Sequence, residues 1–128
     1  MGDTSGVVRI ASRHEYADTV ARLRTEIERR QLTLYAAIDQ QLEAERVGLR
    51  LRPTTLLIFG NPAAGAGVMQ TSPEAAIDLP LKILVWQDAE QVWVAVNDAA
   101  YLQRRHQLPA HLLPVLEGPR AVVEAALA

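Results

Sequence analysis

The stretch from Leu56 to Lys82 decides the fold, and it reads LLIFGNPAAGAGVMQTSPEAAIDLPLK. It begins with an apolar run that stops abruptly at Gly60-Asn61-Pro62. Glycine reaches positive φ, asparagine tolerates it, and proline restricts the residue before it, so this triplet predicts the end of a buried strand. Asp78-Leu79-Pro80 then precedes a second apolar run. The stretch therefore predicts two buried strands joined by a region where a fold can place a pocket.

Further strands are predicted on both sides of this stretch. The first apolar run belongs to a strand over 54–59, and runs over 81–87 and 91–96 form a hairpin around the polar turn Asp88-Ala89-Glu90. The segments 7–11 and 32–38 alternate as strands with one face toward a core do. In 32–38 this alternation places Leu32, Leu34, Ala36 and Ile38 on one face. In the hairpin it places Lys82, Leu84 and Trp86 together.

Helices are predicted between these strands. Ser12 and Glu15 have the spacing of a capping box, and they precede a helix with one buried stripe. That stripe comprises Tyr16, Val20, Leu23 and Ile27, while Arg22, Glu26, Arg29 and Arg30 fall largely on the solvent side. Asp39 is placed to cap a short helix over 40–47, and Asn61 to cap one from Pro62 to about Gln70. A helical turn is predicted at 71–74, a helix capped by Asn97 or Asp98 ends at His106, and an interrupted helical segment covers 111–127.

The resulting order is β-α-β-α-β-(short α)-β-β-α-α. It favours an α+β two-layer domain, with a mostly antiparallel sheet covered by helices, over a doubly wound sheet. A chain of 128 residues fits one domain, which we place at 7–128. Residues 1–6 are small and polar, so we expect a disordered or tag-like start.

The composition excludes several classes of function. A formal net charge of -2, from 13 basic and 15 acidic residues, offers no broad attraction to nucleic acid. The absence of cysteine excludes thiol catalysis, cysteine-ligated zinc, iron–sulfur clusters and disulfides. No apolar run approaches the ~20 residues of a membrane span. We expect a soluble cytoplasmic protein without nucleic-acid or membrane partners.

The combination of motifs in this chain is distinctive. The motifs are Phe59-Gly60-Asn61-Pro62, Asp78 to Lys82, Val92-Trp93-Val94, Asn97-Asp98, Tyr101-Leu102 and Arg105-His106. Together they make the chain, from about Val7 to Ala128, resemble the domain-of-unknown-function family number 302. The resemblance implies a compact α+β fold, a homodimer, a bacterial or archaeal source and no assigned reaction.

The chain departs from this family at two places. Family members often carry histidine after the aspartate that ends the second strand, where this chain has Gln40. They also often carry glycine ahead of that strand, where this chain reads Arg30-Gln31-Leu32. The resemblance therefore gives no support to an activity that needs that imidazole as a base or metal ligand.

The usual signatures of chemistry are weak here. The three histidines, His14, His106 and His111, have no metal-site spacing, so capping or surface roles are favoured and no metal or cofactor is predicted. Gly60, Gly65 and Gly67 resemble part of a phosphate loop. No lysine followed by serine or threonine comes after them, which favours a tight strand-to-helix turn.

Asp78 and Lys82 are more informative, because Lys82 is the one lysine against twelve arginines. It is placed to bind an anion or to serve amine chemistry, although a structural ion pair with Asp78 is favoured. Asn61 and Asn97 each end a strand before a helix, so capping explains both; if the strand ends meet, their amides line one cavity. The candidate ligand-binding residues are Asn61, Met69, Asp78, Lys82 and Asn97.

Three functional hypotheses follow. The first is a dimeric domain that binds a small molecule where the turns beside Asn61 and Lys82 converge. The second is an enzyme that uses Asp78 as acid or base and Lys82 as electrostatic stabiliser or nucleophile. The third is a structural domain that assembles through a strand edge or the helical tail.

Overall fold

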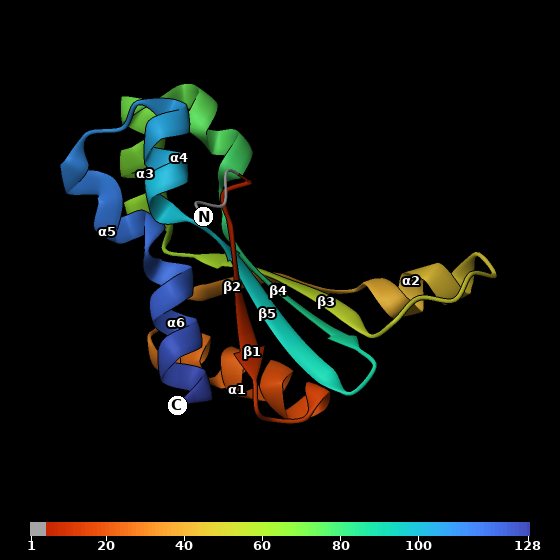
Figure 1. Ribbon diagram of the computed structural model, residues 1–128. Helices are drawn as coiled ribbons and strands as arrows, with labels where there is room; N and C mark the ends of the chain where they lie inside the picture. The colour runs from red at the N-terminus through yellow and green to blue at the C-terminus, as the bar shows by residue number, and fades with distance from the viewer. Residues whose placement is uncertain (1–4) are drawn as a thin grey trace.

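The computed structural model describes residues 5–128 and contains an open five-stranded antiparallel sheet (Figure 1). The strands lie in the order β1-β5-β4-β3-β2. Their bounds are β1 Val7–Ser12, β2 Thr33–Asp39, β3 Thr54–Gly60, β4 Leu81–Asp88 and β5 Gln91–Asn97. The predicted α+β class and the order of strands and helices are confirmed. The disordered or tag-like start expected at 1–6 lies largely outside the described residues, which begin at Ser5. Within them, the carbonyl of Gly6 accepts a hydrogen bond from the amide of Asp98 at 2.7 Å.

The helices fall into three groups (Figure 1). α1 (Tyr16–Arg29) and α6 (Gly118–Leu127) lie together on one face of the sheet, whereas α2 (Gln40–Arg46) projects beyond the far end of β2 and β3. The remaining segments gather at the opposite end of the sheet, and we call them the helical lobe. They are α3 (Pro62–Thr71), the 3₁₀ helix η1 (Pro73–Asp78), α4 (Ala99–His106), the 3₁₀ helix η2 (Ala110–Leu112) and α5 (Leu113–Leu116).

Two apolar clusters hold these parts together. The larger cluster lies between the sheet and the helices α1 and α6; its fully buried members include Leu23, Ile27, Leu57, Phe59, Ile83, Val85, Val94, Val122 and Val123. The smaller cluster lies inside the helical lobe and comprises Val68, Ala75, Leu102, Leu108 and Leu116. Leu79 packs against both clusters. It thereby links the sheet to the lobe immediately before β4 begins.

The predicted helix starts are partly confirmed. Side chains of Asp39, Asn61 and Asp98 cap α2, α3 and α4 by accepting hydrogen bonds from backbone amides. The capping box at Ser12 and Glu15 is wrong. Ser12 ends β1, and its hydroxyl is engaged by the Thr19 hydroxyl at 2.7 Å and by the amide of His14 at 3.2 Å, so α1 begins at Tyr16 without a side-chain cap.

The side-chain alternation of β2 changes at Tyr35, because a β-bulge interrupts its pairing with β3. Leu34 lies opposite Phe59, whereas Ala36 lies opposite Ile58. Since successive residues of β3 point to opposite faces, Leu34 joins the core while Ala36 and Ile38 lie on the other face. The prediction that all of these residues share one face is therefore wrong.

The sheet face opposite α1 and α6, which we call the open face, carries many apolar side chains. Its cross-strand partners include Ile58 with Lys82, Leu56 with Leu84, and Leu84 with Ala95. Trp86 and Trp93 also lie on it as a stacked cross-strand pair with ring centroids 6.5 Å apart, and the Arg9 guanidinium lies 4.3 Å from the Trp93 centroid. Within residues 5–128, no helix lies across this face (Figure 1), and no helix is long and apolar enough to cross a membrane.

Candidate ligand-binding site

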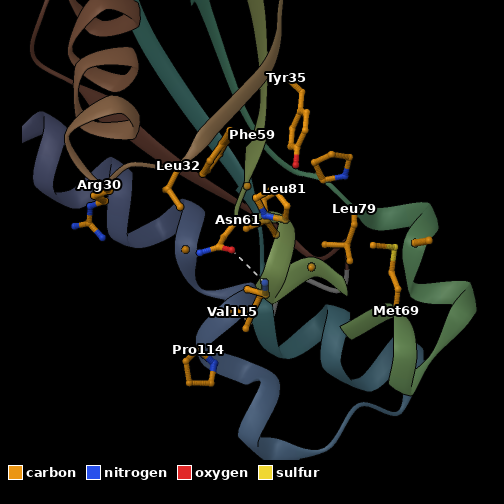
Figure 2. Close-up of a pocket in the computed structure, with 17 residues that line it drawn as sticks. Arg30, Leu32, Tyr35, Phe59, Asn61, Met69, Leu79, Leu81, Pro114 and Val115 are labelled. Atoms are coloured by element: carbon orange, nitrogen blue, oxygen red, sulfur yellow. Dashed lines mark hydrogen bonds between the residues drawn. The ribbon is translucent and has the colours of Figure 1, made fainter. Parts of the chain in front are cut away.

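A pocket of about 600 Å³ lies where the ends of the central strands meet the helical lobe (Figure 2). Its position follows from the sheet register: Phe59 is opposite Leu81, so the residues after β3 and those before β4 must lie side by side. β2 and the start of α6 complete the walls. The lining residues are Arg30, Leu32, Tyr35, Phe59, Gly60, Asn61, Pro62, Ala64, Gly65, Met69, Ala76, Leu79, Pro80, Leu81, Pro114, Val115 and Gly118.

Asn61 is held in place by the start of α3. Its Oδ1 accepts hydrogen bonds from the backbone amides of Ala63 at 3.0 Å and Ala64 at 3.2 Å, and Pro62 occupies the first helical turn, where its missing N–H costs nothing. Because Oδ1 serves the cap, the other amide atom must be the nitrogen. Within the described part of the chain, that Nδ2 donor has no hydrogen-bond partner.

Arg30 lies at the rim of the pocket beside Leu32, with 34% of its side chain exposed (Figure 2). Its Nε donates to Glu26 Oε2 at 2.7 Å, and Arg29 donates to the same carboxylate at 2.6 Å and 3.0 Å. Hydrogen bonds from Arg29 and then Arg30 lower the pKa of Glu26 from 4.5 to about 2. Because one carboxylate is shared by two guanidinium groups, Glu26, Arg29 and Arg30 together carry a net charge of +1 beside the pocket.

Tyr35 supplies the third polar side chain of the lining. It is the bulge residue of the edge strand β2 and is 49% exposed. Figure 2 shows the ring extending from β2 with its hydroxyl end toward Leu81. The bulge therefore directs an edge-strand side chain toward the strand ends, which is a common use of bulges.

The structure separates the predicted site residues into two groups. Asn61 and Met69 line the pocket, whereas Asp78, Lys82 and Asn97 are not part of its lining. Asn97 ends β5 opposite Val7, and Asp98 is the residue that caps α4. The convergence of the turns at Asn61 and Leu79-Pro80 does create a shared concavity, but Lys82 points from the open face of the sheet.

The predicted ion pair between Asp78 and Lys82 is wrong. Asp78 Oδ2 lies 2.5 Å from His106 Nε2 and 3.2 Å from Arg105 Nη1, while Lys82 Nζ donates to the carbonyl of Pro80 at 3.0 Å. Asp78 lies at the end of η1, where it faces α4. Its partners therefore come from α4 rather than from the adjacent strand.

His106 is also placed differently from the surface or capping role expected. Its side chain is 8% exposed, and its bond to Asp78 connects α4 to η1 inside the helical lobe. Among residues 5–128, no group of three or more acidic or histidine side chains is arranged to hold a metal ion. The Asp78–His106 pair is best explained as a connection that stabilises the lobe.

Sequence reasoning missed Arg30 and most of the apolar wall, including Leu79 and Val115. In the sequence, Arg30 is one of several charged residues at the end of an amphipathic helix. Val115 belongs to a helical segment that lies far along the chain from the other lining residues. Their role depends on how the lobe packs against the sheet. Tyr35 could have been found if the bulge had been recognised, but its local sequence contains no glycine to indicate one.

The geometry defines an α+β domain with a mostly apolar pocket at the strand ends. The chain belongs to the family described as domain of unknown function DUF302, whose model matches residues 8–126. A crystal structure of an uncharacterised conserved DUF302 protein from Bacillus stearothermophilus has the same fold, with a TM-score of 0.78 at 16% identity over 96% of each chain.

The chain is also similar to longer proteins. It is 39% identical over 105 residues to proteins named fluoride-specific ion channel FluC 1 from Brucella suis biovar 1 (strain 1330) and Brucella abortus biovar 1 (strain 9-941). The match covers 81% of this chain but 41% and 39% of those proteins. The chain thus spans about two fifths of the length of these curated relatives.

Proposed function

We propose that this domain binds a small, largely apolar molecule in the strand-end pocket. The observation that carries the proposal is the pocket itself: about 600 Å³, with 17 lining residues of which three, Arg30, Tyr35 and Asn61, have polar side chains. Ligand sites commonly have volumes of roughly 300–1,000 Å³, apolar walls and a few placed polar groups. The longer Brucella relatives carry the name of an ion channel, but most of their length lies outside the match, so the proposal rests on this chain's own pocket.

An uncharged fluorescent probe, N-phenyl-1-naphthylamine, tests this proposal. We expect its fluorescence to rise when it binds the protein, and we expect Gly65→Phe to abolish the rise. Gly65 lines the pocket, and a Cβ added there meets Met69 Cε at 4.0 Å, so the substitution fills the pocket without a backbone clash.

Gly67→Phe is the matched control. Gly67 lies two residues further along α3, it is not part of the pocket lining, and a Cβ added there meets nothing within 4 Å. Both substitutions change the same helix in the same way. Equal loss of probe fluorescence in the two variants, or no binding to the unaltered protein, would refute the proposal.

The enzyme hypothesis based on Asp78 and Lys82 loses its geometric basis. The two side chains do not pair, and neither lines the pocket. Asp78 is already engaged by His106 and Arg105.

The open face of the sheet favours a second proposal, that the domain forms a homodimer. An antiparallel sheet that leaves one face to water normally carries polar side chains there. This face instead presents Leu56, Ile58, Leu84, Trp86 and Trp93, mostly half-buried and without a covering helix among the described elements. A second copy presents an identical apolar face, and a two-fold axis brings the two faces together.

A further inference from the structure

We propose that the strand-end pocket takes a small apolar carboxylate, whose charged end lies against Arg30 and Asn61. This inference rests on the proposed function and adds the chemical class of the ligand. Two features carry it: the balance of charge in the lining and the unused hydrogen-bond donors at one side of the pocket.

The formal charge in the pocket lining is positive. Among the described residues that line the pocket, Arg30 is the one with a formal charge, and there is no aspartate, glutamate, lysine or histidine. Glu26 does not cancel this charge, because its carboxylate is shared between Arg29 and Arg30. A ligand with a single negative charge complements this lining, whereas a cation would meet no counter-charge there.

Two residues of the lining also have unengaged hydrogen-bond donors. Asn61 Nδ2 has no partner within residues 5–128, since Oδ1 alone serves the helix cap. Figure 2 shows the amide nitrogen on the side of Asn61 nearer to Leu32 and Arg30, while Tyr35 and Met69 lie on the other side. Arg30 Nη1 has no partner in that part of the chain either, because Glu26 takes Nε and the carbonyl of Ala121 lies 3.5 Å from Nη2. A guanidinium and an amide N–H₂ suit a carboxylate, which accepts several hydrogen bonds.

The remaining wall suits the rest of such a molecule. Met69 of α3, Leu79 of the turn between η1 and β4, and Val115 of α5 contribute apolar side chains to the lining (Figure 2). Methionine adapts its shape to irregular apolar surfaces. An aromatic or branched aliphatic body therefore fits this part of the pocket.

The test compares 2-naphthoate with its uncharged amide, 2-naphthamide, by isothermal titration calorimetry at neutral pH. We expect the unaltered protein to bind naphthoate at least about tenfold more tightly, the order that one charge-assisted hydrogen bond contributes. We expect Arg30→Gln to reduce this preference to within about twofold and to leave the affinity for the amide unchanged.

Two variants make the comparison independent of folding effects. Arg24→Gln removes the same charge from an exposed position of α1 that does not line the pocket, and it leaves the ion pairs of Glu26 with Arg29 and Arg30 intact, so the preference should persist. Asn61→Asp keeps an equally good helix cap while replacing the amide donor with a negative charge, so naphthoate binding should fall at least tenfold.

The outcomes separate this inference from the proposed function. If N-phenyl-1-naphthylamine binds as expected but naphthoate is no tighter than naphthamide, the pocket binds ligands and the assignment of a carboxylate is wrong. The assignment is also wrong if the preference survives both Arg30→Gln and Asn61→Asp. If none of the three compounds binds, both proposals fail together.

Discussion

Glu26 has a structural role that its position in the sequence does not predict. Its position on α1 predicts an exposed charge, yet the residue is 8% exposed and holds Arg29 and Arg30. The prediction failed because helical periodicity assigns a face, but does not show where α6 covers the edge of that face. Arg30 also reaches the carbonyl of Ala121 in α6, at 3.5 Å.

Glu26 therefore predicts a specific dependence of stability on pH. Its folded pKa of about 2 lies below the ordinary 4.5, so the carboxylate adds stability that is complete above about pH 4.5 and is lost as the pH falls toward 2. Glu26→Gln should lower the melting temperature at pH 7 and leave it nearly unchanged at pH 2. Thermal melts by circular dichroism across this range measure the difference. Glu28→Gln, on the exposed side of α1, is the control and should follow the unaltered protein at every pH.

Gln31 illustrates what a single sequence cannot show. Its φ is +59°, a left-handed conformation that favours glycine, and it lies within the segment Arg30-Gln31-Leu32, where the family resemblance implies a glycine. The local sequence Arg30-Gln31-Leu32 contains no sign of this turn.

At the scale of elements, the strand-to-helix junctions were the most predictable features. Asn61 with Pro62, Asp39 and Asp98 cap their helices as expected, because capping depends on neighbouring residues alone. The prediction that Ser12 caps a helix was wrong because Ser12 ends β1 and its hydroxyl is engaged by the hydroxyl of Thr19. The bulge at Tyr35 was likewise decided by pairing with β3, which lies far along the chain.

The helix α3 contains two glycines, and this predicts a gain in stability. Gly67 lies inside α3 and an added Cβ meets nothing within 4 Å, so Gly67→Ala should stabilise the protein by about 1 kcal/mol through helix propensity. Urea denaturation measures this change. Gly48 is the matched contrast, because its added Cβ also meets nothing but its φ is +79°. Gly48→Ala should therefore destabilise by about 1 kcal/mol, and a gain at both positions would contradict this account.

At the scale of the whole molecule, the order of strands explains the part of the candidate site that is formed by the ends of β3 and β4. The sequence predicted a mostly antiparallel sheet in which the turns beside Asn61 and Lys82 converge. Antiparallel pairing of β3 with β4 brings the turn after Phe59 beside the turn before Leu81. The parity of β4 also placed Lys82 with Leu84 and Trp86, away from the core. The rest of the lining, including Arg30 and Val115, could not be predicted because it depends on how the helical lobe packs against the sheet, for which the chain has no local signal.

The open face gives the prediction that belongs to this scale. If two copies join through it, Leu84→Glu should convert a dimer to a monomer, because Leu84 lies between Leu56 and Ala95 in the middle of the face. Light scattering coupled to size-exclusion chromatography measures the mass. Leu49→Glu is the control, since Leu49 is 64% exposed in the segment after α2, outside the sheet. A monomeric unaltered protein, or a Leu84→Glu variant that stays dimeric, would contradict the proposed interface.

The position of Leu79 against both apolar clusters has one more consequence. The walls of the pocket come from β3 and β4 on one side and from α3 and α5 on the other. An occupant would therefore contact both the sheet and the helical lobe. Opening of either the sheet end or the lobe would then require loss of the ligand contacts, so the ligand would couple the two parts. Hydrogen exchange would slow in the sheet and in the lobe together, and the ligand would make the domain more cooperative as well as more stable.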